Sequence, residues 1–352
     1  MEKYNKSLNA IVFWRIVFTY SIMILHYKSQ HDIHLGWYIA VEFFFVVSGW
    51  LLAMDVDKKD HDTYSYCWHR IKRLYPEYFF AYWIAVVVAF SLSQAEEFVN
   101  FISWFIEKGI YEMFMIHFWG WGIARADMVD VPTWYISVML LAGIILYSAA
   151  KRFPNLLKEI LLPIIIVVFL TYSYRKYGNI QENKVSSIYL HLRLFRGMAE
   201  MGLGYLLYQL NKVVKPYIKN SNMLKAGGFV ALLLVVLCSY NHFGKEDFVY
   251  LAMICFGVII SFNTSLNFLG KYGRIIMNYF GELSYSLFLS HNIFRKWIFP
   301  YYGAGSSIFY LVAYLLIVTV YSIIFHLVVK CIIKYANIMF KNMKMRSIAK
   351  EE

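Results

Sequence analysis

The chain has 352 residues, of which 60% are hydrophobic and 16% are charged. A soluble domain usually carries about a quarter charged residues, so this composition excludes an ordinary soluble globular protein. The formal net charge of +12 would suggest nucleic-acid binding in a soluble protein, but here it lies mainly in short loops between apolar segments. That distribution is typical of membrane proteins, and we expect a lipid bilayer, and no nucleic acid, as the partner.

Apolar segments of helix-spanning length follow one another along nearly the whole chain. They predict about ten transmembrane helices, at about residues 8–28, 36–54, 77–95, 133–150, 159–174, 196–210, 226–241, 247–264, 283–300 and 306–334. Residues 96–121 are too charged to cross easily and predict an amphipathic segment on the membrane surface. The expected fold is all-α: a polytopic bundle of membrane helices with short loops, forming one domain over residues 1–352 without an appended soluble domain.

Lysine and arginine are concentrated in alternate loops, at residues 55–76, 151–158, 211–225 and 265–281, and in the C-terminal tail. The positive-inside rule places these loops and both termini in the cytoplasm. Arg175, Lys176 and Lys184 depart from the pattern, because they follow the fifth predicted span on the opposite side. The expected location is the inner or plasma membrane, with multiple spans.

Two ionisable side chains lie within the first predicted span. His26 follows Arg15 by about three helical turns, so the two side chains share one helix face and lie about 16 Å apart along the axis. An ionisable group inside the membrane is costly unless it faces the bundle interior and has a partner. On spacing alone, an arginine that reaches the headgroups and an interfacial histidine are an alternative to a functional pair.

Other predicted spans also carry charged residues. Arg196 and Glu200 are spaced i,i+4, so they can pair on one face of the sixth span. Glu42 in the second span needs a partner, and we expect Arg15 or His26 to provide it.

Six segments, taken in chain order, resemble one known family. They are FWRIVFTYSIMILHY, VEFFFVVSGWLL, HRIKRLYPEYF, PTWYIS, FRGMAEMGLGYLL and FGELSYSLFLSH. They are distributed between residues 13 and 291, and together they resemble the acyltransferase 3 family of membrane acyltransferases. Met139 departs from the pattern, since many members have a glutamate at that position.

The resemblance implies that the protein transfers an acyl group, usually acetyl, from cytoplasmic acyl-CoA to a hydroxyl of a carbohydrate acceptor at the cell surface. It makes His26 either the general base for the acceptor hydroxyl or a covalent acyl carrier. Arg15 would stabilise the thioester or the developing oxyanion, and Glu42 would orient His26.

The same resemblance implies a donor side and an acceptor side. Coenzyme A is polyanionic, and the basic segment with Arg70, Lys72 and Arg73 lies on the predicted cytoplasmic side, where arginine forks match phosphate oxygens. Residues expected on the substrate side are Trp134, Ser137, Arg196, Glu200, Tyr285 and His291. We expect acetyl-CoA as the donor and no metal, because the histidines show no metal-ligand spacing.

A flippase or exporter of a glycan intermediate is the alternative function, because buried charges and many spans suit a transporter as well. A membrane-embedded polysaccharide polymerase or ligase is a third possibility. An enzyme consumes acyl-CoA and leaves an ester on its product, whereas a carrier does neither. The sequence leaves open the acceptor's identity and the oligomeric state, a homo-oligomer included.

Overall fold

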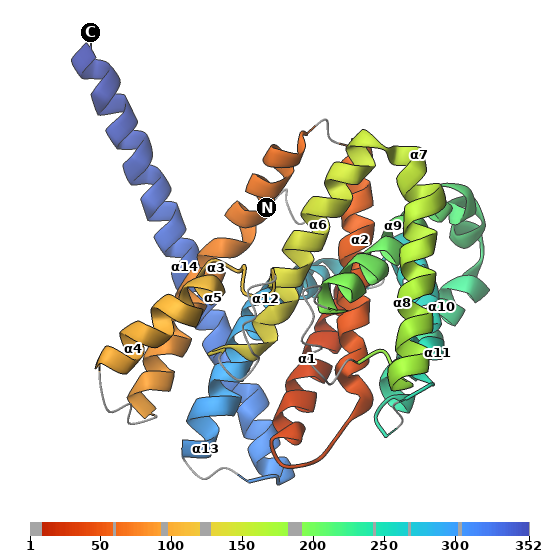
Figure 1. The fold of residues 1–352 in the computed structure, drawn as a ribbon, viewed down its shortest axis with the longest axis horizontal. Coiled ribbons are helices and arrows are strands. Elements are labelled where there is room, and N and C mark those ends of the chain that lie inside the picture. Colours follow the sequence, from red (N-terminus) through yellow and green to blue (C-terminus); the bar gives the residue numbers. More distant parts are fainter. Residues whose placement is uncertain are drawn as a thin grey trace.

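The computed structural model describes residues 9–58, 61–92, 98–119, 128–181, 192–241, 244–266, 269–301 and 305–351. Within these ranges the chain forms helices joined by short connections, with an isolated bridge between Asn9 and Ser265 and no strand. Figure 1 shows most of the helices gathered into one bundle. The predicted all-α fold is therefore confirmed.

The helices follow the chain in this order: α1 (Ile11–Ser29), α2 (Ala40–Lys58), α3 (Thr63–Leu92), α4 (Phe98–Trp104), α5 (Ile110–Met113), α6 (Trp134–Arg152), α7 (Pro154–Leu156), α8 (Leu162–Tyr177), α9 (Leu192–Asn220), α10 (Asn222–Cys238), α11 (Asp247–Asn263), α12 (Gly270–Ile293), α13 (Phe299–Tyr301) and α14 (Ile308–Glu351). A 3-10 turn, Gly36–Ile39, precedes α2.

A helix lies at every predicted span, but the count of about ten crossings is not confirmed. Among the described residues, five helices are long and apolar enough to cross a membrane. They extend over Gly36–Lys58, Thr63–Ser91, Val131–Arg152, Pro154–Tyr177 and Ile308–Met339. The pair α9 and α10, bent by 112°, would add a sixth crossing if it forms one broken span. The difference has two physical reasons. Helix α11 is apolar but has only 17 residues, and α9, which carries Arg196 and Glu200, is less apolar than the spanning helices.

Two close helix contacts decide which residues of the interior meet. Helices α2 and α9 touch backbone to backbone: a Cβ on Gly49 would lie 1.8 Å from the Met201 carbonyl oxygen, and one on Gly204 would lie 1.9 Å from that of Val46. Helix α1 approaches α12 closely at Gly281, where a Cβ would lie 2.4 Å from Val12. Small residues permit such approaches in membrane helices. The first contact brings Glu42 to Arg196, and the second brings Arg15 and His26 to α12.

The predicted surface segment is helical over residues 98–113, and it is anchored to α3. The Tyr82 hydroxyl donates to the Gly109 carbonyl at 2.9 Å, and the Tyr78 hydroxyl donates to the Glu112 carbonyl. Glu112 is buried and accepts the backbone N–H groups of Val129 and Asp130 at 3.0 and 2.8 Å. The segment therefore also ties down the chain that enters α6.

Helix α14 has 44 residues, which corresponds to about 66 Å at 1.5 Å per residue. A bilayer hydrocarbon core is about 30 Å thick. Figure 1 shows the C-terminal part of α14 leaving the bundle, on the same side as α7. This helix is thus longer than a single crossing requires.

Candidate active site

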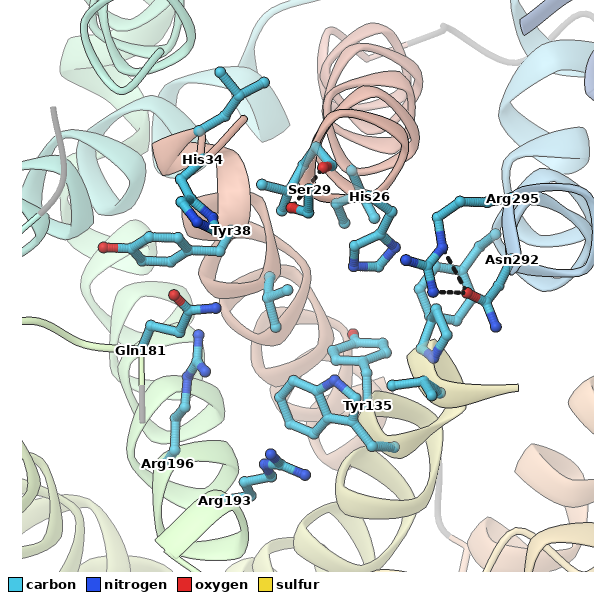
Figure 2. Close-up of a pocket in the computed structure, with 18 of the residues that line it drawn as sticks. His26, Ser29, His34, Tyr38, Tyr135, Gln181, Arg193, Arg196, Asn292 and Arg295 are labelled. Carbon is cyan, nitrogen blue, oxygen red and sulfur yellow. Dashed lines mark hydrogen bonds between the residues drawn. The ribbon is translucent and has the colours of Figure 1, made fainter. Parts of the chain in front are cut away.

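A cavity of about 640 Å³ lies where α1, α2, α6, α9 and α12 meet. It is close to the C-terminal ends of α1 and α12 and to the N-terminal ends of α2, α6 and α9. Figure 2 shows the polar side chains that line it, which come from these helices and from the connections next to them. The labelled ones are His26, Ser29, His34, Tyr38, Tyr135, Gln181, Arg193, Arg196, Asn292 and Arg295. Its volume falls within the range of small-molecule sites.

His26 is held at the cavity by a second histidine. Its Nδ1 lies 2.8 Å from Nε2 of His291, and the two ring planes are inclined by 14° with centroids 5.1 Å apart. His291 is fully buried, and its Nδ1 lies 2.6 Å from the Phe288 carbonyl oxygen. A carbonyl oxygen only accepts, so Nδ1 of His291 carries the proton and Nε2 of the neutral ring is an acceptor. His26 must then donate its Nδ1–H to His291, which makes Nε2 the basic nitrogen of neutral His26.

Glu42 pairs with Arg196, and the expectation that its partner is Arg15 or His26 is wrong. Nη2 of Arg196 donates to Oε1 of Glu42, and Nε donates to Oε1 of Glu200 at 3.0 Å. Both carboxylates are fully buried. The predicted i,i+4 pair of Arg196 and Glu200 is therefore confirmed. The close contact between α2 and α9 explains the correction, because it brings Glu42 to α9.

Arg15 belongs to a second group of polar residues. Its Nη2 donates to the Ser284 hydroxyl on α12 at 3.1 Å. Arg15 is within electrostatic range of Arg73, and Tyr135 is within range of both Arg15 and Arg70. Three arginines from α1 and α3 thus share one region of the bundle.

Tyr135 connects the arginine region with the cavity. Its ring lines the cavity, packed edge-on against Phe288 at a centroid distance of 6.1 Å. Its hydroxyl shares a 3.0 Å hydrogen bond with Ser48, whose hydroxyl also lies 3.5 Å from the Met139 sulfur. Tyr135 therefore touches both the cavity around His26 and the surroundings of Arg15.

A model of the Acyl_transf_3 family, described as an acyltransferase domain, matches residues 9–327. The chain belongs to this acyltransferase family. No curated protein and no solved structure matches it. With the apolar helices of the fold, the family makes this chain a multi-pass membrane acyltransferase.

The structure places some of the predicted acyltransferase residues on the cavity and others elsewhere. His26, Trp134 and Arg196 line it, and His291 is bonded directly to His26. Ser137 is instead fully buried behind it, where its hydroxyl accepts the Phe118 N–H at 3.1 Å.

Tyr285 and Lys72 lie away from the cavity. The Tyr285 hydroxyl donates to the Leu74 carbonyl at 3.2 Å, and the residue is within electrostatic range of Arg73. Tyr285 therefore belongs to the arginine region instead of the acceptor side. Lys72 is exposed on α3, one residue before the likewise exposed Arg73.

Several residues that line the cavity were not among the site residues predicted from the sequence, above all Arg193, Asn292 and Arg295. Arg193 precedes Arg196 by about one helical turn, and Arg295 follows His291 by about one turn, so helical periodicity gave a signal for both. Ser284, the partner of Arg15, lies in the predicted FGELSYSLFLSH segment, but only packing shows what it contacts.

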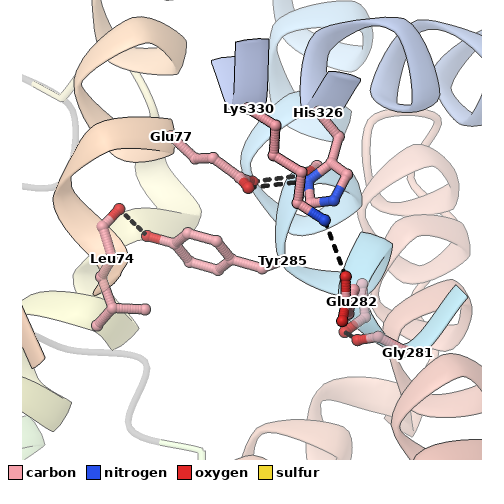
Figure 3. Close-up of polar contacts among 9 residues, drawn as sticks. Leu74, Glu77, Gly281, Glu282, Tyr285, His326 and Lys330 are labelled. Carbon is pink, nitrogen blue, oxygen red and sulfur yellow. Dashed lines mark hydrogen bonds and ion pairs between the residues drawn. The ribbon is translucent and has the colours of Figure 1, made fainter. Parts of the chain in front are cut away.

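Figure 3 shows another buried polar cluster, which joins α3, α12 and α14. Nδ1 of His326 lies 2.8 Å from Oε1 of Glu77, and the Ser286 hydroxyl lies 2.6 Å from Oε2 of Glu77 and 3.1 Å from the same Nδ1. In a nucleophilic triad the serine and the carboxylate meet opposite ring nitrogens. Here both meet Nδ1, so the cluster does not have that arrangement and instead links three helices.

The described residues contain no group of histidine, cysteine, aspartate or glutamate side chains arranged to hold a metal ion.

Proposed function

We propose that this membrane acyltransferase moves an acyl group, most favourably acetyl, from cytoplasmic acyl-CoA to a hydroxyl of a sugar or polysaccharide outside the cytoplasm. The observation that carries the proposal is the placement of His26. Its Nδ1 is directed to His291, so Nε2 is the basic nitrogen, and the residue lines a cavity of about 640 Å³. Family membership supports the reaction type.

His26 acts as the general base in the proposed step. Its Nε2 takes the proton of the acceptor hydroxyl, and the hydroxyl oxygen attacks the thioester carbonyl carbon. A new C–O bond forms, the C–S bond breaks, and the proton passes to the departing sulfur, which leaves as the thiol of coenzyme A. His291 is a positioning residue in this scheme, because it accepts the Nδ1–H of His26 before and during the proton transfer.

The donor enters from the side of Arg15, Arg70 and Arg73 in this proposal. These three cations suit the phosphates and the thioester oxygen of acyl-CoA, with Lys72 nearby on the surface. The acyl end of the donor then passes Tyr135 to reach His26, about 16 Å from Arg15 along α1. The proposed topology has both termini in the cytoplasm of a cell with the protein in its plasma membrane, which follows from the positive-inside rule.

The test is acyl transfer by a His26→Ala variant in membranes that hold equal amounts of inserted protein. We expect loss of both CoA release and ester formation, at least ~100-fold, because general-base catalysis typically contributes that much. His31→Ala, a histidine in the connection just after α1, is the matched control and should retain activity. Normal ester formation by His26→Ala would refute the assignment. Glycan movement without consumption of acyl-CoA would favour an exporter.

The donor side has its own prediction. The double variant Arg70→Ala/Arg73→Ala should raise the apparent KM for acyl-CoA by about tenfold or more, because hydrogen bonds to charged groups contribute about 1.5–3 kcal/mol. Arg152→Ala removes an exposed arginine on the same predicted side and serves as the control. An unchanged KM in the double variant would remove these residues from the donor site.

A further inference from the structure

We infer that the cavity accepts an acyl acceptor that carries a negatively charged group, bound by Arg193 and Arg295 while its hydroxyl lies at His26. The inference rests on the proposed function in calling the occupant an acceptor. It extends that function by naming the charge of the substrate, which family membership leaves open.

The first observation is the sign of the charges around the cavity. Among the lining residues in the described part of the chain, three are arginines, two are histidines and none is acidic. Arg196 adds little positive charge, because Glu42 and Glu200 both bind it. Arg193 and Arg295 are the other two arginines, and Figure 2 shows them on opposite sides of the cavity.

Arg193 is held in place by two aromatic rings. Its guanidinium carbon lies 4.8 Å from the ring centroid of Phe118 and 5.1 Å from that of Trp134. Stacking on aromatic faces fixes the plane of a guanidinium and lowers the entropy lost when it binds a ligand. Phe118 is itself fixed by its N–H bond to Ser137, which gives that buried serine a positioning role.

Arg295 is oriented from α12. Its Nε and Nη2 both donate to Oδ1 of the fully buried Asn292, at 3.0 and 2.7 Å. Arg295 is also within electrostatic range of His291. A cation beside the His26–His291 pair attracts an anionic acceptor to the reacting nitrogen.

The geometry distinguishes a charged acceptor from a neutral one. Neutral sugars are usually bound by hydroxyl, amide and aromatic groups, whereas planar forks of arginine match the oxygens of carboxylates and phosphates. A uronic-acid carboxylate and a sugar phosphate share this chemistry. Two guanidinium groups that line the same cavity therefore favour an anionic acceptor over a neutral one.

The experiment is a thermal-shift titration of the purified full-length chain in detergent, from which affinities are obtained by ligand linkage. The probes are D-glucuronate, D-glucose 1-phosphate, D-glucose as the neutral match, and inorganic phosphate. We expect both acidic sugars to bind at least ~10-fold more tightly than glucose, and their advantage to shrink as ionic strength rises. Binding of glucuronate alone would identify a carboxylate as the recognised group, and binding of the sugar phosphate alone would identify a phosphate.

Variants connect the preference to the two arginines. Arg193→Gln and Arg295→Gln should each lose about tenfold in affinity for the acidic sugars, with little change for glucose. Arg193→Lys should keep part of the preference, because it retains the charge but not the fork. Arg175→Gln, an exposed arginine at the end of α8, is the control and should bind as the wild type does.

The inference is overturned if glucose binds as well as the acids, if no acidic sugar stabilises the protein, or if both glutamine variants keep the full preference. A variant whose unliganded melting temperature falls far below that of the wild type is replaced by the lysine variant at the same position. His26→Ala should keep the preference for the acids over glucose, because Arg193 and Arg295 remain, yet transfer no acyl group. Acid binding without any acyl transfer by the wild type would therefore refute the proposed function and leave the binding inference standing.

Discussion

Arg196 bridges the buried carboxylates of Glu42 and Glu200. The stability lost when one of these three side chains is removed therefore depends on which one it is. Without Glu42, one arginine and one glutamate remain as a balanced pair. Without Arg196, Glu42 and Glu200 both lose the guanidinium that they share. Breaking a buried pair by removing one partner typically costs about 3–5 kcal/mol.

We therefore expect Arg196→Ala to destabilise the protein more than Glu42→Ala does. The expected loss is about 3–5 kcal/mol for the first and less for the second. The measurement is the melting temperature of the purified protein, with Arg175→Ala as an exposed arginine control. Equal losses for the two variants, or a larger loss for Glu42→Ala, would contradict this account of the cluster.

Glu112, outside the spanning helices, gives a prediction about pH. Burial raises the pKa of its carboxyl from 4.5 to about 7. Between these two pH values the carboxyl is protonated in the folded state and ionised in the unfolded state. Its contribution to the free energy of unfolding is therefore fully present below pH 4.5 and is lost as the pH rises through about 7. The wild-type melting temperature should fall from pH 5 to pH 8 more than that of Glu112→Gln. Parallel pH profiles would show that Glu112 titrates without this shift.

At the scale of elements, helical periodicity predicted most of what lies on one helix and little of what lies between helices. The spacing of Arg15 and His26 on one face, and the pairing of Arg196 with Glu200, both follow from the 3.6-residue turn. The partner of Glu42 and the bond from His26 to His291 depend on where α2 meets α9 and α1 meets α12. Those contacts arise from long-range packing, and hydropathy carries no information about them.

The glycines at the contact between α2 and α9 should be the most sensitive positions in these helices. Gly204→Ala would place a methyl group 1.9 Å from the Val46 carbonyl oxygen, so the helices must separate and Glu42 must move from Arg196. We expect a loss of several kcal/mol, as for strongly overpacked sites, together with a large loss of acyl transfer. Gly227→Ala in α10 is the matched control, because its nearest neighbours would be Phe256 ring atoms at 3.7 and 3.8 Å. A harmless Gly204→Ala would mean that the two helices pack less closely than the structure shows.

The whole molecule separates two sets of arginines along the bundle. Arg15, Arg70 and Arg73 lie toward the start of α1 and in the first half of α3, and Arg193 and Arg295 lie at the other end around the cavity. The proposed transfer needs such a division, because in it donor and acceptor arrive from opposite sides of the membrane. The sequence predicted Arg70 and Arg73 from a basic loop and Arg15 from its place in the first span, while the second set became visible once five helices were assembled around one cavity.

This division requires the two ends of α10 to lie on opposite sides of the membrane. Asn220, just before α10, and Asn241, just after it, are both exposed. In a background with the four native cysteines replaced, Asn241→Cys should react with a membrane-impermeant maleimide added to intact cells, and Asn220→Cys should react only after the membrane is opened. Labelling of both from outside would make the bent pair α9–α10 a re-entrant segment. It would leave the cavity on the outer side and contradict the cytoplasmic placement of Asn220. Labelling of Asn220→Cys alone would invert the topology and bring acyl-CoA to the end that carries Arg193 and Arg295.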